Sequence, residues 1–216
     1  MTNAQRILDL VMKLRLIAII RLADLSAAEA LSGSLLRGGI GLQEFTLTNA
    51  DALKTVSHLR QSVAAFDGIQ AALGIGSIRS LEQAKAAHQC GAQYLVTPTV
   101  NVDVIRYCVE QDLAIVCGAF TPTEVLTAWD TGATAVKVFP ARQLGPNYIR
   151  DVLAPLPEIR LIPTGGIDLR NMQQYLDAGA VGVGIGGNLV NPKLIENADW
   201  ERVVAVANDY SKAARC

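Results

Sequence analysis

Eight short apolar segments alternate with amphipathic segments along almost the whole chain. The apolar runs have the length and composition of buried β-strands, and the segments between them repeat apolar residues at helical spacing. Strands that alternate with helices form parallel sheets, because each helix carries the chain back across the sheet. The pattern therefore predicts an α/β protein with strands at Leu16–Arg21, Leu42–Leu47, Ala71–Gly76, Gln93–Thr97, Ala114–Cys117, Ala133–Phe139, Arg160–Pro163 and Val181–Ile185.

The number of these units favours a closed (β/α)8 barrel, or TIM barrel, over an open doubly wound sheet. No linker or change of composition separates the units, and 216 residues suit one such barrel. We therefore predict a single (β/α)8 barrel domain spanning residues 1–216, with an extra N-terminal helix at residues 3–14 across the bottom. The other predicted helices are Ser26–Arg37, Ala50–Ala65, Ser80–Gln89, Val102–Gln111, Thr123–Thr131, Asn147–Leu153, Leu169–Ala178 and Trp200–Ala214, and Ser26 and Asn101 are expected to cap theirs.

Composition excludes several classes of function. The 19 basic and 20 acidic residues leave a net charge of -1 without a basic stripe, so we expect no nucleic-acid partner. No apolar run is long enough for a membrane span, and the N-terminus lacks a secretory pattern. Four cysteines without a C-x-x-C pair, together with only two histidines, indicate reduced thiols, a cytoplasmic protein and no metal site.

Lys137 is the principal candidate for catalysis. In a (β/α)8 barrel the reactive groups lie at the C-terminal ends of the strands, and Lys137 occupies such an end in the apolar segment AVKVFP. Side chains alternate along a strand, so Lys137 points to the face opposite Val136 and Val138. If the valines face the helices, the lysine amine enters the barrel, where apolar walls suit imine formation with a ketone. The alternative is a structural lysine that reaches the rim or pairs with a carboxylate.

Glu44 is the expected partner of that lysine. In the segment QEFTLT, Glu44 shares one strand face with Thr46 and Thr48. If this polar face lines the barrel interior, a carboxylate lies near the lysine amine and can move protons, directly or through one water. The alternative is a Glu44–Lys137 ion pair that only fills the barrel.

Other strand ends supply candidate groups for substrate binding. Arg21 ends the segment IAIIR, and a guanidinium binds a carboxylate bidentately, so a 2-keto acid is a natural ligand. A solvated arginine at the rim is the alternative. The remaining candidates are the hydroxyl groups of Thr48, Ser77 and Thr97, and the apolar walls of Pro98 and Phe139.

Two glycine-rich segments in the last third of the chain are typical of an anion site. Phosphate in this fold is often held by the loops after strands seven and eight, through backbone N–H groups that glycine allows to approach closely. A purely structural role in tight turns is the alternative. The candidates are Thr164, Gly165, Gly166, Gly186, Gly187 and Asn188.

With AIIR, LQEFTLT, VTPTVN, AVKVFPA, PTGGI and GIGGNL in this order, the chain resembles the 2-keto-3-deoxy-6-phosphogluconate (KDPG) and 4-hydroxy-2-oxoglutarate (KHG) aldolases. The resemblance covers nearly the whole chain, and K-x-F-P followed by P-T-G-G-I is its most specific part. It implies a pyruvate-forming class I aldolase that is usually a homotrimer and uses neither metal nor cofactor.

Residue by residue, the resemblance implies that Lys137 is the Schiff-base lysine and Glu44 the general acid and base. It places Thr97, Pro98 and Phe139 at the pyruvate site and the four loop glycines at the phosphate. The chain departs from the family pattern in three places. Ser77 replaces the threonine of a G-A-G-T segment, Thr48 replaces an arginine that some members carry, and Asn188 replaces a serine of many phosphate-binding members.

The resulting hypothesis is a lyase that cleaves KDPG to pyruvate and glyceraldehyde 3-phosphate, KHG to pyruvate and glyoxylate, or both. The galactonate-derived isomer of KDPG is an alternative substrate. A phosphosugar isomerase or synthase on the same barrel, with an electrostatic Lys137, is a rival, as is a non-catalytic binding protein descended from an aldolase.

Overall fold

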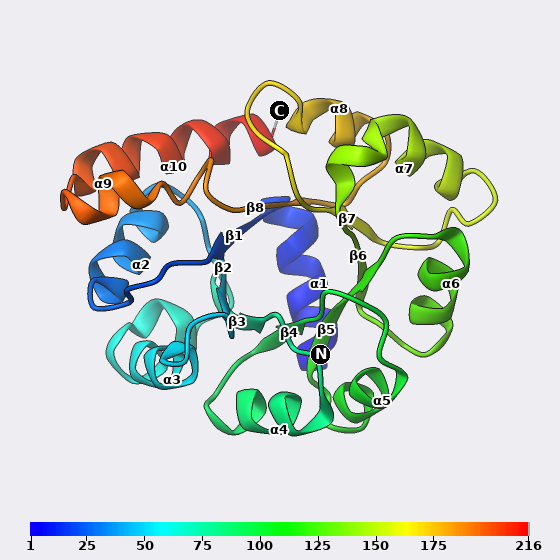
Figure 1. Ribbon diagram of the computed structural model, residues 1–216, viewed down its shortest axis with the longest axis horizontal. Helices are drawn as coiled ribbons and strands as arrows, with labels where there is room; N and C mark the ends of the chain where they lie inside the picture. The colour runs from blue at the N-terminus through cyan, green and yellow to red at the C-terminus, as the bar shows by residue number, and fades with distance from the viewer. Residues whose placement is uncertain (216) are drawn as a thin grey trace.

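Eight parallel strands form a ring in the computed structural model, which describes residues 1–215. Neighbours pair in the order β7-β6-β5-β4-β3-β2-β1-β8, and a parallel bridge from Thr164 to Gly184 joins the two ends. The (β/α)8 barrel is therefore confirmed (Figure 1). The strands are β1 (Leu16–Ile20), β2 (Leu42–Thr46), β3 (Ala72–Gly76), β4 (Tyr94–Val96), β5 (Ala114–Ala119), β6 (Ala135–Val138), β7 (Leu161–Pro163) and β8 (Val183–Ile185).

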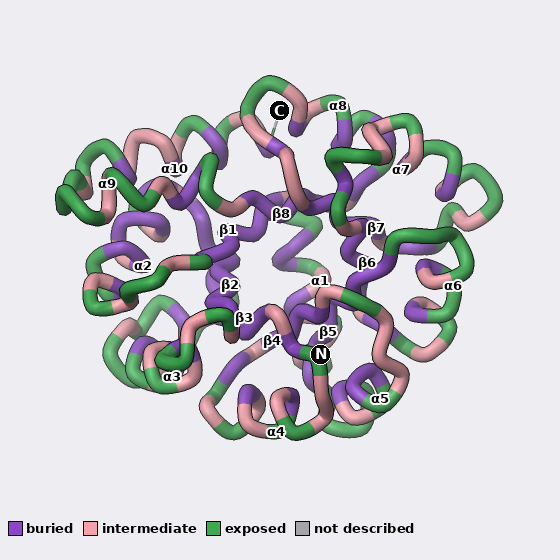
Figure 2. The backbone as a smooth tube through the Cα atoms, in the orientation of Figure 1, coloured by how far each residue is buried: buried purple, intermediate pink, exposed green. Residues whose placement is uncertain are grey.

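Helices surround the ring and turn their buried sides toward it (Figure 2). They are α2 (Ala28–Arg37), α3 (Ala52–Ser62), α4 (Leu81–Gln89), α5 (Val102–Glu110), α6 (Pro122–Asp130), α7 (Gly145–Leu153), α8 (Met172–Asp177), α9 (Pro192–Glu196) and α10 (Trp200–Ala214). Two short 3-10 helices, η1 (Ala64–Asp67) and η2 (Ala141–Gln143), follow α3 and β6. No helix in this described part of the chain is both long and apolar enough to cross a bilayer.

The extra N-terminal helix, α1 (Asn3–Leu14), lies across the bottom of the barrel (Figure 1). Its buried residues Ile7, Leu10, Val11 and Leu14 form one apolar cluster with strand residues that point into the barrel. The cluster includes Leu42, Tyr94 and Ile162 from three different strands. The helix thus closes the N-terminal end of the ring, which leaves the C-terminal end open for a site.

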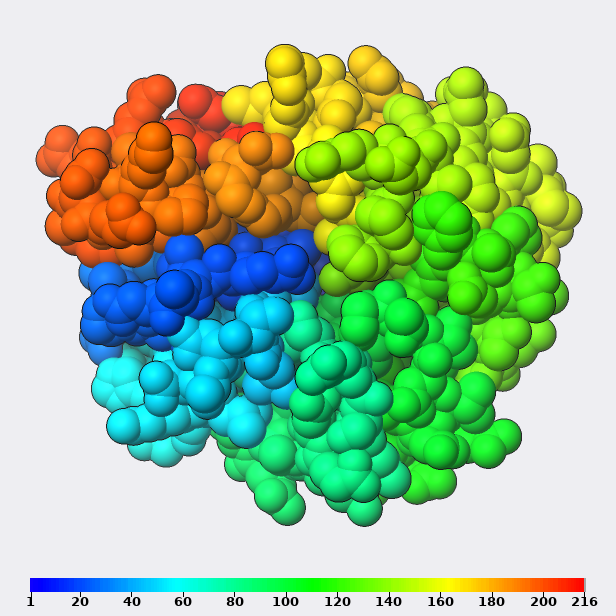
Figure 3. Space-filling model, in the orientation of Figure 1, coloured from blue at the N-terminus to red at the C-terminus, as the bar shows by residue number. Residues whose placement is uncertain are grey.

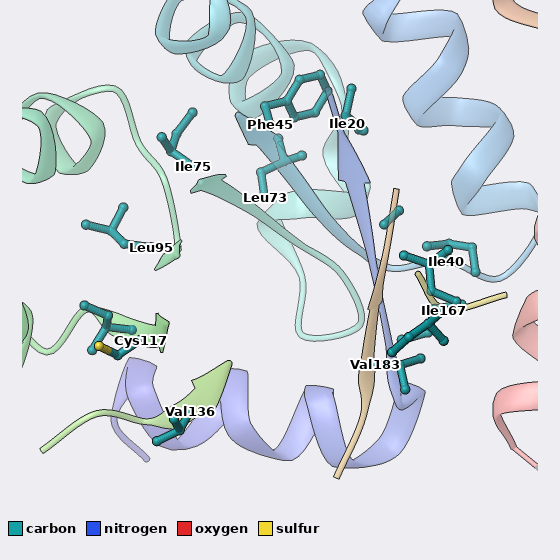
Figure 4. Packing of buried hydrophobic residues seen from close by; sticks show 14 of the residues in the cluster. Ile20, Ile40, Phe45, Leu73, Ile75, Leu95, Cys117, Val136, Ile167 and Val183 are labelled. Atoms are coloured by element: carbon teal, nitrogen blue, oxygen red, sulfur yellow. The ribbon is translucent and has the colours of Figure 1, made fainter. Parts of the chain in front are cut away.

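A second and larger apolar cluster lies between the strands and the outer helices. Figure 4 shows Ile75, Leu95 and Val136 on the outer side of their strands. Val136 and Val138 both belong to this outer cluster, so Lys137 between them points inward. Phe45 is likewise outward, which turns Glu44 toward the interior.

Glycine replaces a side chain inside the barrel at two positions of β3. Gly74 pairs with Glu44 on one side and with Tyr94 on the other. A Cβ atom at Gly74 would lie 2.4 Å from the Tyr94 ring, so the ring crosses the strand over the bare glycine backbone. Tyr94 is fully buried and fills the floor beneath the open end.

One of the two expected helix caps is present, and two other local details differ from the sequence-based expectations. Asn101 caps α5 by accepting a hydrogen bond from the Val104 N–H, as expected. Ser26 does not cap α2, because its hydroxyl donates to Asp24 and the helix begins at Ala28. The helix α9, only five residues long, was not predicted.

Gly74→Ala tests the requirement for a bare backbone inside the barrel. The added methyl group overlaps the buried Tyr94 ring, so we expect a loss of about 1–3 kcal/mol in the free energy of unfolding. Urea denaturation followed by circular dichroism measures this loss. Gly33→Ala in α2 is the matched control: its Cβ atom has only the Arg37 side chain nearby, at 3.7 Å, so it should stabilise by about 0.5–1 kcal/mol. Equal effects of the two variants would contradict the steric account.

Candidate active site

A cavity of about 310 Å³ opens at the C-terminal ends of the strands. Segments that follow β1 (blue), β6 (yellow-green) and β8 (orange) converge on the centre of this face in Figure 3. The cavity brings together nine of the residues predicted for the site: Arg21, Lys137, Phe139, Thr164, Gly165, Gly166, Gly186, Gly187 and Asn188. Its other lining residues are Ile19, Arg142, Ile167 and Gly184.

Lys137 enters this cavity from β6 and is only 6% exposed. Its Nζ atom lies 5.1 Å from the centre of the Phe139 ring, two residues along the same strand face. On β5 it pairs with Gly118, where a Cβ atom would collide with the Pro98 backbone. The amine therefore lies beside an aromatic wall and next to a strand position without a side chain.

Glu44 is 2% exposed and reaches upward from β2, inside the barrel. Its carboxyl group lies over Gly76, where any Cβ atom would overlap it. Burial raises the pKa of Glu44, and the positive charges of Lys137 and Arg21 reduce that rise. No ion pair within 4.0 Å joins Glu44 to Lys137 or Arg21 in residues 1–215. The simple ion pair considered from the sequence is therefore absent there.

The remaining predicted residues belong to the β2–β4 side and do not line the same cavity. The Thr48 and Thr46 hydroxyls are 2.7 Å apart. Thr97 is buried, and its Oγ1 atom accepts a hydrogen bond from the Gly118 N–H at 3.0 Å. Ser77 has a φ of 63°, an unusual conformation for a residue with a side chain. Pro98 contributes backbone next to Gly118.

The two glycine segments form the opposite wall of the cavity. Gly165 and Gly166 have φ values of 99° and 78°, which residues with side chains rarely adopt. The Asn188 side-chain amide donates to the Ile167 carbonyl at 3.0 Å, which ties the loop after β8 to the loop after β7. The backbone N–H groups of such loops suit an anionic ligand.

Arg142 also lines the cavity, and it is not among the residues predicted from the sequence. It lies in η2, three residues beyond the Phe139 ring, and crosses Gly166: a Cβ atom there would lie 2.5 Å from the Arg142 Nε atom. The available signal was a basic residue shortly after the K-x-F-P segment. The cavity lining thus contains Arg21, Lys137 and Arg142 but no acidic residue.

Within residues 1–215, no three His, Cys, Asp or Glu side chains lie close enough together to hold a metal ion. Both histidines have other partners. His58 pairs with Glu29 at 2.9 Å and His88 contacts the Tyr107 hydroxyl at 3.0 Å, each on the outer helices.

The raised pKa of Glu44 predicts a pH-dependent cost in stability. Between the ordinary value of 4.5 and the raised folded-state value, the unfolded chain releases the Glu44 proton while the folded chain keeps it. Ionisation therefore favours the unfolded state, and this cost grows as pH rises through that window. Glu44→Gln removes the cost, so its free energy of unfolding should increase relative to wild type as pH rises above 4.5.

Urea unfolding at several pH values between about 4 and 8 measures this difference. Glu201→Gln, an exposed substitution on α10, is the control. Parallel stability curves for Glu44→Gln and wild type would contradict the buried, proton-retaining carboxyl.

Known proteins match this chain in both sequence and structure. A family profile described as "KDPG and KHG aldolase" matches residues 7–206. The 2-dehydro-3-deoxy-6-phosphogalactonate aldolase of Escherichia coli K12 is 32% identical over 204 residues, covering 94% of this chain and 98% of that protein. The 2-dehydro-3-deoxy-phosphogluconate aldolase of Treponema pallidum is 32% identical over 196 residues, covering 90% and 91%.

A solved structure described as native KDPGal aligns with a TM-score of 0.85 at 32% identity, over 94% of this chain and 95% of that one. The profile match extends through every strand that contributes to the cavity. The chain therefore belongs to the KDPG and KHG aldolase family, as its sequence motifs predicted.

Proposed function

We propose that the chain is a class I aldolase that cleaves a 2-keto acid to pyruvate and an aldehyde through an imine on Lys137. One observation carries the proposal: a buried amine and a buried carboxyl group share the barrel interior without forming an ion pair, and the amine lines a cavity at the C-terminal ends of the strands. Family membership and the aldolase names of the relatives support it and place the activity among the lyases.

The first steps form the imine. In its neutral form, the amine of Lys137 attacks the C2 carbonyl of the substrate and gives a carbinolamine. Glu44, as a proton relay directly or through water, protonates the departing hydroxyl, which leaves as water. The raised pKa of Glu44 suits this role, because it makes the protonated carboxyl group more accessible than that of an ordinary glutamate.

The imine then accepts the electron pair of the C3–C4 bond. Glu44, through water, removes the proton of the C4 hydroxyl, and the bond breaks to release the aldehyde. The enamine left on Lys137 is protonated at C3 and hydrolysed, which frees pyruvate and the amine. These steps balance without an external oxidant, reductant or metal ion.

We assign the substrate's two ends to different walls of the cavity. Arg21, whose charge acts on Glu44, would bind the C1 carboxylate near the amine. The glycine segments after β7 and β8 would hold a phosphate. The relatives named for phosphogluconate- and phosphogalactonate-derived acids support either phosphorylated sugar acid as substrate, with KHG as a shorter one.

We further propose a homotrimer in the cytoplasm, on the strength of the family resemblance. The small, anionic keto acid would be its only required partner during turnover. We expect neither nucleic acid nor a membrane to contribute.

Pyruvate and borohydride test the imine directly. Incubation of the protein with both should add one reduced pyruvate to a single site, which peptide mass spectrometry should locate at Lys137. Lys137→Ala should lose the adduct and nearly all cleavage activity. Lys85→Ala, which removes an exposed lysine on α4, is the control and should retain both. An unmodified Lys137, or full activity in Lys137→Ala, would exclude the proposed reaction and favour an isomerase or a binding protein.

Glu44→Gln separates proton transfer from amine chemistry. The amide keeps the shape of the side chain but cannot exchange the proton, so we expect kcat to fall by about 10²- to 10⁴-fold. Burst and steady-state kinetics with KDPG provide the measurement. A variant that cleaves the substrate at the wild-type rate would show that Glu44 has only a structural role.

A further inference from the structure

We propose that Arg142 binds the terminal anion of the substrate and selects phosphorylated keto acids over their unphosphorylated counterparts. The inference rests on the proposed aldolase function and assigns a specificity-determining residue to it. Arg142 is not one of the residues that the family motifs indicate, and it enters the cavity from η2 rather than from a glycine loop.

The backbone that carries Arg142 is fixed on two sides. The Ala141 N–H donates to the Thr164 carbonyl at 2.8 Å, which ties η2 to the end of β7. The Tyr175 hydroxyl on α8 donates to the Ala141 carbonyl at 3.1 Å. The base of the arginine side chain therefore has a defined position beside the glycine segment, and binding needs to order only the side chain beyond it.

A series of contacts leads along the cavity wall from the Lys137 amine to the Arg142 guanidinium. The Lys137 amine faces the Phe139 ring, and a Cβ atom at Gly165 would lie 3.5 Å from the same ring. The Arg142 side chain lies over the next residue, Gly166, at the place where a Cβ atom would otherwise be. Arg142 thus marks the end of the cavity away from the reacting amine.

The charge of Arg142 has no partner within residues 1–215. Its side chain is exposed at the cavity mouth and takes part in no hydrogen bond or ion pair there. The nearest acid along the glycine segment, Asp168, is already bound by Arg170 at 2.6 Å. A guanidinium with free donors, next to a positive-φ glycine segment, matches the charge and geometry of a phosphate.

Length distinguishes the possible ligands. The second carboxylate of KHG lies closer to its ketone than the phosphate of a six-carbon sugar acid does. With the ketone at Lys137, we expect the longer molecule to extend past Phe139 toward Gly166 and Arg142. Arg142 should therefore act on the phosphorylated sugar acids.

The experiment compares KDPG, or its galactonate-derived isomer if that is cleaved faster, with the same acid lacking phosphate. We expect Arg142→Gln to lower the ratio of kcat/KM for the phosphorylated over the unphosphorylated acid by about tenfold or more. Arg142→Lys, which keeps the charge but not the planar fork, should recover part of that ratio. Arg150→Gln removes an exposed arginine from α7 and is the charge-matched control, with an unchanged ratio.

Inorganic phosphate provides a second reading that does not depend on turnover. It should raise the melting temperature of wild type and of Arg150→Gln, and raise that of Arg142→Gln much less. An unchanged ratio and an unchanged phosphate effect in Arg142→Gln would overturn the proposal. So would an equal loss with both acids, because Arg142 would then act near the ketone. If pyruvate trapping on wild type failed while phosphate stabilisation still required Arg142, the aldolase function would be wrong and the anion site correct.

Discussion

Space inside the barrel is the constraint on which the candidate site depends. Each strand sends alternate residues into one narrow interior, so a long side chain from one strand needs a bare position on its neighbour. Gly74 gives room to the Tyr94 ring, and Gly76 gives room to the Glu44 carboxyl group. Gly118, which pairs with Lys137 on β6, gives room to the Pro98 backbone. The Glu44 carboxyl group is thus placed by packing against glycine backbone, and no ion pair joins it to Lys137 in residues 1–215.

This manner of placement has an electrostatic consequence. A carboxylate held in an ion pair is stabilised in its charged form and is a poor proton carrier. Glu44 instead loses hydration through burial, and the positive charges of Lys137 and Arg21 offset that loss only in part. The resulting carboxyl group tolerates both protonation states, which a reaction with alternating proton donation and removal requires.

The fold and the inward direction of the reactive pair were predictable because both depend on periodicity. The outward valines of β6 fix Lys137, and the outward Phe45 fixes Glu44, whatever the surrounding loops do. Features that depend on three-dimensional turns were not predictable. Ser26 was expected to cap α2 but bonds to Asp24 instead, and Arg142 reaches the cavity only because η2 folds back onto the end of β7. A list of strand ends does not include a residue placed in that way.

The positive φ values of Gly165 and Gly166 also limit how this binding wall can change over evolution. A side chain at either position would strain the backbone, and at Gly166 it would also collide with Arg142. The wall itself is therefore nearly closed to substitution, and new recognition chemistry has to arrive from an adjoining segment. The turn after β6 is such a segment: single substitutions there can exchange the chemistry offered to the ligand while the glycine backbone and the reacting lysine keep their places.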